Sequence, residues 1–222
     1  SIDIEPTVPR ERVMVAEGRH ADHELRVARE FGLGAEVQTF SHPFVLATDF
    51  RPHLKRMVRR IERLPGPIGC HGPFIDTIHF SYDPWIMEAS RRRYLQAMDI
   101  AETLGARFVL FHGQYNPLIK LPAYPDIYHT QNLAFWPDLL AEAERRNLPI
   151  YLENMFDDSP EPLVRLAAEF NTPWLRLCFD PSHSLLHSSI PLEEWLDRFA
   201  PYLAHVHLTD CHGTFDDHLP LG

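Results

Sequence analysis

The segment AHVHLTDCHGTFDDHLPLG, residues 204–222, joins a short β-type run to a group of side chains that commonly bind metals. The run AHVHL contains His207, and three aspartates and two histidines follow it, namely Asp210, His212, Asp216, Asp217 and His218. Imidazole and carboxylate groups suit Zn²⁺, Mn²⁺, Fe²⁺ and Co²⁺. If the other apolar runs of the chain also end in possible metal ligands, that pattern indicates the fold class.

Six further apolar runs occur along the chain, and amphipathic segments separate them. One such segment has the apolar spacing of a helix that faces a core, with Leu54, Met57, Val58, Ile61 and Leu64 on one stripe. This alternation predicts a parallel sheet with helical crossovers. An open doubly wound sheet would need a glycine-rich phosphate turn, and the sequence has no G-x-G-x-x-G pattern. The six runs are VMVA (13–16), AEVQTF (35–40), PIGCH (67–71), RFVLFH (107–112), PIYLEN (149–154) and LRLCFD (175–180).

Five successive runs end in, or carry, a possible metal ligand. These ligands are His71, His112, Glu153, Asp180 (with His183 three residues later) and His207. Each residue alone has a simpler explanation as a loop histidine or as the N-cap of the next helix. A barrel brings the carboxyl ends of many strands to one face, so the five together predict both a (β/α)₈ TIM barrel and a metal site.

A histidine and several aromatic residues follow the fourth run. We expect residues 124–130 to form a loop on the active face of the barrel, so that His129 would lie near substrate or at the surface. The aromatic side chains around this loop would either wall a pocket or simply pack together.

Composition narrows the class of protein. The formal net charge of −10 disfavours a nonspecific grip on nucleic acid, which needs a basic face. No apolar run reaches the length of a membrane span. The three cysteines form no C-x-x-C pair, so we expect a reduced, cytoplasmic protein without a membrane partner.

The motifs at the ends of the runs resemble those of the xylose isomerase-like TIM-barrel superfamily. This group contains endonuclease IV (AP endonuclease family 2) and many sugar or sugar-phosphate isomerases and epimerases. In this superfamily the last motif is followed by a helix and an eighth strand that bears a glutamate ligand. We therefore expect residues 1–222 to form a single TIM-barrel domain, truncated at the C-terminus, that lacks the eighth βα unit. The motifs are HGPF (71–74), FHG (111–113), LEN (152–154), FDPSH (179–183), VHLTD (206–210) and DDHLPLG (216–222).

The resemblance implies a set of site residues. Glu153, Asp180 and His207 match the ligands of the metal that the superfamily shares. His71 and His112 match ligands of a further metal, with Glu153 bridging. His183 matches a residue that contacts substrate in the epimerases and binds an additional metal in the nucleases, beside Asp216 and His218. One to three divalent ions, Zn²⁺ or Mn²⁺, are implied, and Glu153 and His183 are the candidate catalytic residues.

Three functions fit this site. The first is a sugar or sugar-phosphate isomerase or epimerase, in which the metal stabilises an enediolate formed by proton abstraction next to a carbonyl. The second is an endonuclease IV-like, zinc-dependent phosphodiesterase that acts at abasic sites in DNA. The third is a catalytically silent barrel that binds a ligand. Nucleic acid is the less favoured partner, because Lys120 stands almost alone in the loop after the fourth run. The oligomeric state stays open.

Overall fold

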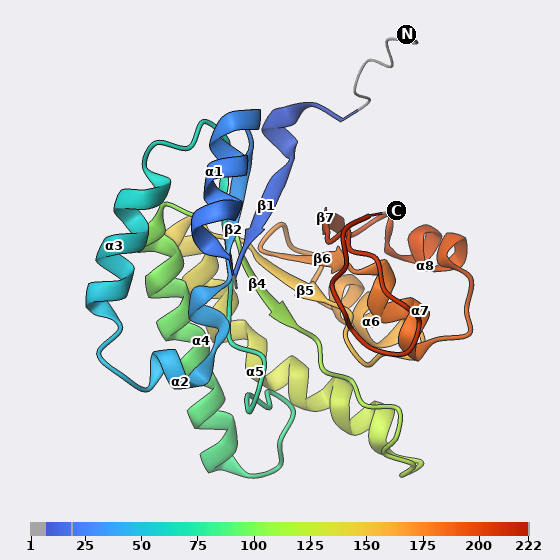
Figure 1. The fold of residues 1–222 in the computed structure, drawn as a ribbon. Coiled ribbons are helices and arrows are strands. Elements are labelled where there is room, and N and C mark those ends of the chain that lie inside the picture. The colour runs from blue at the N-terminus through green and yellow to red at the C-terminus, as the bar shows by residue number, and fades with distance from the viewer. Residues whose placement is uncertain (1–7, 19, 222) are drawn as a thin grey trace, which may run out of the picture. The chain divides into compact units, whose positions relative to one another are not determined.

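Parallel strands alternate with helices through the computed structural model, which describes residues 8–18 and 20–221. The strands of this part of the chain form a seven-stranded sheet in chain order, and the β1–β2, β2–β3, β5–β6 and β6–β7 pairs are parallel (Figure 1). This confirms the predicted alternation. The strands are β1 (Met14–Glu17), β2 (Gly34–Val37), β3 (Ile68–His71), β4 (Val109–His112), β5 (Ile150–Glu153), β6 (Leu175–Phe179) and β7 (Leu203–Val206).

Eight α-helices and two short 3₁₀ helices connect the strands of the described residues. No helix among these residues is long and apolar enough to cross a membrane. The α-helices are α1 (Ala21–Phe31), α2 (Pro43–Leu46), α3 (Arg51–Ile61), α4 (Pro84–Leu104), α5 (Tyr124–Arg146), α6 (Glu161–Phe170), α7 (Pro181–His187) and α8 (Leu192–Phe199), and the 3₁₀ helices are η1 (Arg10–Arg12) and η2 (Thr39–Ser41).

The chain divides into two compact units. The first comprises the residues up to Ile75 together with Gln96–Val109, and the second comprises Asp76–Leu95 together with the residues from Leu110 onward. Strands β1 to β3 belong to the first unit, and β5 to β7 belong to the second. The single truncated domain over residues 1–222 stays a prediction.

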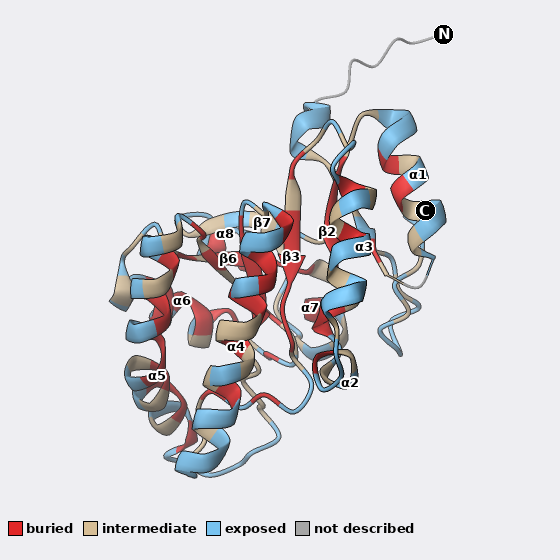
Figure 2. Cartoon of the chain, turned by 90° about the vertical axis from the view of Figure 1, so that its left-hand side faces the viewer, coloured by how far each residue is buried: buried red, intermediate tan, exposed pale blue. Residues whose placement is uncertain are grey.

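The core of each unit lies along its strands. In the first unit, α1 packs against β1 and β2 through Leu25 and Ala28, and all four residues of β2 are buried. In the second unit the rings of Tyr94 and Phe111 stack with their centroids 4.0 Å apart, and Trp136 is fully buried beside them. Buried residues lie along the strands, whereas helices such as α3 and α5 are exposed on their outward-facing sides (Figure 2).

The expected loop at residues 124–130 is wrong, because α5 begins at Tyr124. Pro125 lies in the first turn, where a helix needs no backbone N–H donor, so it starts the helix instead of breaking it. Tyr124, Tyr128, Asn132 and Trp136 recur every four residues and form one buried face. His129 therefore lies on a helix and is 7% exposed.

Two glycines of the first unit, Gly34 and Gly66, lie in a place where backbone atoms leave no room for a Cβ atom. A Cβ atom on Gly34 would overlap with the carbonyl oxygen of Pro67, and one on Gly66 would overlap with the backbone nitrogen of Gly34. The same Pro67 oxygen accepts a 2.9 Å hydrogen bond from the backbone of Ala35. Since backbone atoms cannot move aside as a flexible side chain can, a larger residue must distort the start of β2.

Replacing Gly34 by alanine should therefore lower the free energy of unfolding by about 1–3 kcal/mol. Urea or thermal unfolding followed by circular dichroism measures this change. Gly18→Ala is the matched control, because its Cβ would meet Gln38 at 3.7 Å, an ordinary contact. Equal stabilities of the two variants would contradict the account of this turn.

Candidate metal centre

Three side chains of the second unit leave the ends of adjacent strands. Glu153 is the last residue of β5, and Asp180 directly follows β6. The sequence places His207 within the seventh strand, but β7 ends at Val206 and His207 is the next residue. Its backbone N–H still bonds to Phe179 on β6 at 3.0 Å, so the pairing continues to this point.

Glu153 is the centre of the cluster and is 1% exposed. His207 Nδ1 lies 2.8 Å from one carboxylate oxygen, and His112 Nε2 lies 3.0 Å from the other. His183 Nδ1 lies 3.6 Å from the first oxygen. Burial would raise the pKa of Glu153, but His207 and His112 more than offset this and hold the pKa well below its usual value. The group is therefore a buried carboxylate.

Asp180 is fully buried and uses one of its two oxygens to cap α7. Its Oδ1 accepts a 3.1 Å hydrogen bond from the backbone of His183. Its Oδ2 is also buried and has no hydrogen-bond partner among the described residues. Burial raises the pKa of Asp180, against the influence of His183. A buried acceptor without a donor is costly, and a bound cation would satisfy it.

A second cluster joins His183 to the segment after β7. His183 Nε2 lies 3.3 Å from Asp216 Oδ2, and His218 Nε2 lies 3.1 Å from the same oxygen. Burial lowers the pKa of His183, but the hydrogen bond to Asp216 and the charges of Glu153, Asp180 and Asp216 raise it overall to about 9. The hydrogen bond to Asp216 also raises the pKa of His218. The three side chains therefore attract positive charge to one point, either as protons or as a cation.

The donor set fits a divalent cation. The ligand atoms of Glu153, Asp180 and His183 lie within 4.8 Å of one another, as do those of His183, Asp216 and His218. Imidazole nitrogen and carboxylate oxygen are ligands of Zn²⁺ and Mn²⁺. The second unit thus brings together every predicted ligand except His71, while the assignment of each residue as a ligand stays a prediction.

His71 belongs to the first unit. It is the last residue of β3 and is buried. Its Nδ1 atom lies 2.8 Å from the carbonyl oxygen of Gly72. Because a carbonyl only accepts, this contact selects the tautomer with a hydrogen on Nδ1. That tautomer suits a metal ligand, and the role of His71 stays a prediction.

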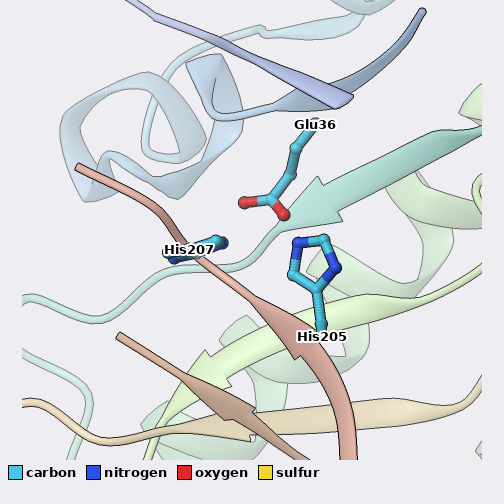
Figure 3. A group of neighbouring side chains, drawn as sticks. All are labelled: Glu36, His205 and His207. Carbon is cyan, nitrogen blue, oxygen red and sulfur yellow. The ribbon is translucent and has the colours of Figure 1, made fainter. Parts of the chain in front are cut away.

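Sequence reasoning missed polar side chains that lie one layer deeper in the strands. Cys178 on β6 is buried, and its ligand atom lies within 4.8 Å of those of Glu153 and His207. His205 precedes His207 by two residues, and their ring centroids are 5.3 Å apart (Figure 3). Glu36, also labelled in Figure 3, is a buried residue of β2 in the first unit. The two-residue period of a strand is the signal that finds Cys178 below Asp180 and His205 below His207.

A family model described as xylose isomerase-like TIM barrel matches residues 25–222. The chain belongs to this family. The match confirms the TIM-barrel class that the strand ends predicted, and the structure accounts for seven strands of it within residues 8–18 and 20–221. Similar proteins include three uncharacterized proteins of Methanocaldococcus jannaschii, MJ1188, MJ1614 and MJ1311, which are 23%, 26% and 25% identical over 73%, 68% and 77% of this chain. The chain spans about three fifths of the length of these relatives, at 59%, 59% and 60%.

Solved structures show the same fold. The TTHB071 protein from Thermus thermophilus, from a crystal soaked with ZnCl₂, is 28% identical with a TM-score of 0.77, covering 95% of this chain and 82% of that one. A D-tagatose 3-epimerase-like protein is 20% identical with a TM-score of 0.75, covering 94% and 80%. The 3-keto-D-glucoside 4-epimerase of E. coli is 15% identical with a TM-score of 0.69, covering 91% and 83%.

One further carboxyl group, that of Asp157, is buried in the second unit. Asp157, in the loop after β5, is 1% exposed, and its Oδ2 accepts a 2.9 Å hydrogen bond from the backbone of Met155. Its Oδ1 is buried without a hydrogen-bond partner among the described residues. Burial raises the pKa of Asp157 to about 7. The folded chain thus favours the protonated form, so Asp157 contributes stability at low pH and loses it as the pH rises through about 7.

Asp157→Asn should therefore stabilise the protein above pH 8, by up to about 4 kcal/mol, because asparagine keeps the shape without the buried charge. The difference from the wild type should vanish below about pH 4, where the unfolded carboxyl is also protonated. Chemical denaturation across this pH range, with a chelator present, measures the difference. Asp158→Asn changes an exposed neighbour and serves as the control. A stability difference that does not vary with pH would contradict the account.

Proposed function

We propose that the protein is a divalent-metal-dependent sugar or sugar-phosphate isomerase or epimerase. The observation that carries the proposal is the buried Glu153 carboxylate between His112 and His207, beside the unsatisfied Oδ2 of Asp180. Family membership, together with the epimerase names of several structural neighbours, supports a carbohydrate as the substrate class.

Glu153, Asp180 and His207 would hold the cation at the ends of three adjacent strands. When bound, a Zn²⁺ or Mn²⁺ ion supplies a Lewis acid that polarises a carbonyl and stabilises the enediolate produced by proton loss beside it. Glu153 and Asp180 are buried and His207 is partly buried, so little bulk water reaches the site, which strengthens electrostatic interactions with the reacting oxygens.

Glu153 and His183 would handle the substrate. The low pKa of Glu153 keeps the carboxylate deprotonated, so that it can take up a proton from the carbon next to the carbonyl and return it. His183 Nδ1 lies 2.7 Å from the backbone oxygen of Asn154, which leaves Nε2 directed to the side of Asp216. From that side His183 would hold a substrate hydroxyl by a hydrogen bond.

A second candidate function is a metal-dependent phosphodiesterase that cleaves DNA at abasic sites. The triplet of His183, Asp216 and His218 favours it, because clustered ions stabilise both the attacking and the leaving oxygen of a phosphodiester. The loop from 113 to 123 contains a single lysine and no arginine, which favours a small substrate over a DNA backbone.

Full-length protein loaded with Mn²⁺ should exchange the proton next to the carbonyl of at least one ketose in D₂O, as followed by NMR over a panel of ketoses and ketose phosphates. Glu153→Gln should lower this exchange by about 10²–10⁴-fold while the protein stays folded, because an amide cannot accept the proton.

Glu194→Gln is the matched control, since it changes an exposed carboxylate on α8 of the same unit. Unchanged exchange in Glu153→Gln would remove the proposed role of Glu153. Cleavage of an abasic-site oligonucleotide, without exchange on any ketose, would replace the proposed function by the second candidate.

A further inference from the structure

The side-chain amide of Asn154 pairs with the backbone of Asp180 across the ends of two strands. Its Nδ2 donates to the Asp180 carbonyl at 2.8 Å, and its Oδ1 accepts from the Asp180 N–H at 2.8 Å. One partner can only accept and the other can only donate, so the orientation of the amide is fixed. Asn154 is 1% exposed and Asp180 is fully buried, so water does not compete for these bonds.

This pair extends the sheet beyond its last backbone pairing. In the β5–β6 register, Glu153 lies opposite Cys178. Asn154 directly follows β5, and its side-chain amide takes the place of a peptide group opposite Asp180. Two hydrogen bonds therefore connect the residue that follows Glu153 to Asp180 itself, which sets the spacing of two proposed ligands on different strands.

The backbone of Asn154 also orients a third proposed ligand. Its carbonyl oxygen accepts the His183 Nδ1–H at 2.7 Å. This contact keeps a hydrogen on Nδ1 and orients the ring so that Nε2 faces Asp216. Asp180 meanwhile accepts the backbone N–H of His183, so that Asn154, Asp180 and His183 form a closed network. Asn154 is thus linked to three proposed ligands. It is joined to Glu153 by a peptide bond and to Asp180 and His183 by hydrogen bonds.

We propose that Asn154 is a positioning residue for the cation site, which it holds at the ligand spacing required for binding. The inference rests on the proposed function, because it concerns the ligands of that site. Alanine would leave the Asp180 N–H without a partner in a buried place, and the Asp180 C=O would keep only the 3.3 Å hydrogen bond from the Ser184 N–H. Aspartate would keep an acceptor for the N–H, but it would place a second carboxylate oxygen against the Asp180 carbonyl.

The test is a titration of full-length, metal-free protein with Co²⁺ alone, followed by the visible absorption of the bound ion. Asn154→Ala should bind Co²⁺ about 10–100-fold more weakly than the wild type, with an altered spectrum. Asn132→Ala is the matched control. Asn132 is equally buried in the same unit and makes two side-chain hydrogen bonds of 2.7 Å, to Tyr128 and Trp136, which hold no proposed ligand. Asn132→Ala should lose thermal stability to a similar extent but keep the wild-type affinity within about twofold.

The outcomes separate the positioning role of Asn154 from the existence of the cation site. Wild-type affinity and spectrum in folded Asn154→Ala would overturn the positioning role and leave the cation site standing. An equal loss of affinity in Asn132→Ala would also overturn it, because general destabilisation would then explain both. A wild-type protein that binds no Co²⁺ would overturn the proposed function and this inference together. If Asn154→Ala does not fold, Asn154→Asp replaces it, with the same weakening expected and wild-type binding as the contrary result.

Discussion

A buried carboxylate must be compensated by nearby opposite charge, and Glu153 is the group on which the candidate centre depends. Its two oxygens lie 2.8 Å from His207 and 3.0 Å from His112, so each oxygen has an imidazole beside it. An uncompensated charge at this depth would be neutralised or would destabilise the fold. The low pKa of Glu153 shows that the surrounding groups favour the charged form. The same surroundings favour a cation, because metal ions and protons compete for the same ligands.

The parallel sheet makes this arrangement possible. Adjacent parallel strands end at the same edge, so residues far apart in the sequence, such as Glu153, Asp180 and His207, meet there without any contribution from a long loop. The register is maintained past the last strand residues by the amide of Asn154 and by the bond from His207 to Phe179. Ligands held on strand ends are better fixed than ligands held on loops.

Much of the fold could be predicted from the sequence, because apolar runs of buried strands are interrupted by prolines, glycines and charged residues. All seven strands overlap the predicted runs, and the strand-end rule selected the residues that cluster in the second unit. The prediction of a loop at residues 124–130 was wrong, since a proline in the first turn, here Pro125, starts a helix. Asn154 lies in the LEN motif, but nothing in the sequence assigned a role to its side chain. Its role comes from hydrogen bonds to Asp180, and a sequence does not reveal which amide pairs with which backbone group.

The central claim is that the strand-end side chains bind a divalent cation directly. Anomalous diffraction from crystals of the full-length protein grown with Mn²⁺, recorded at the manganese absorption edge, tests it most directly. The account predicts a peak within bonding distance of oxygen and nitrogen atoms of Glu153, Asp180 and His207. A clear map with no peak at these residues, or with a peak held by other side chains, would contradict the account.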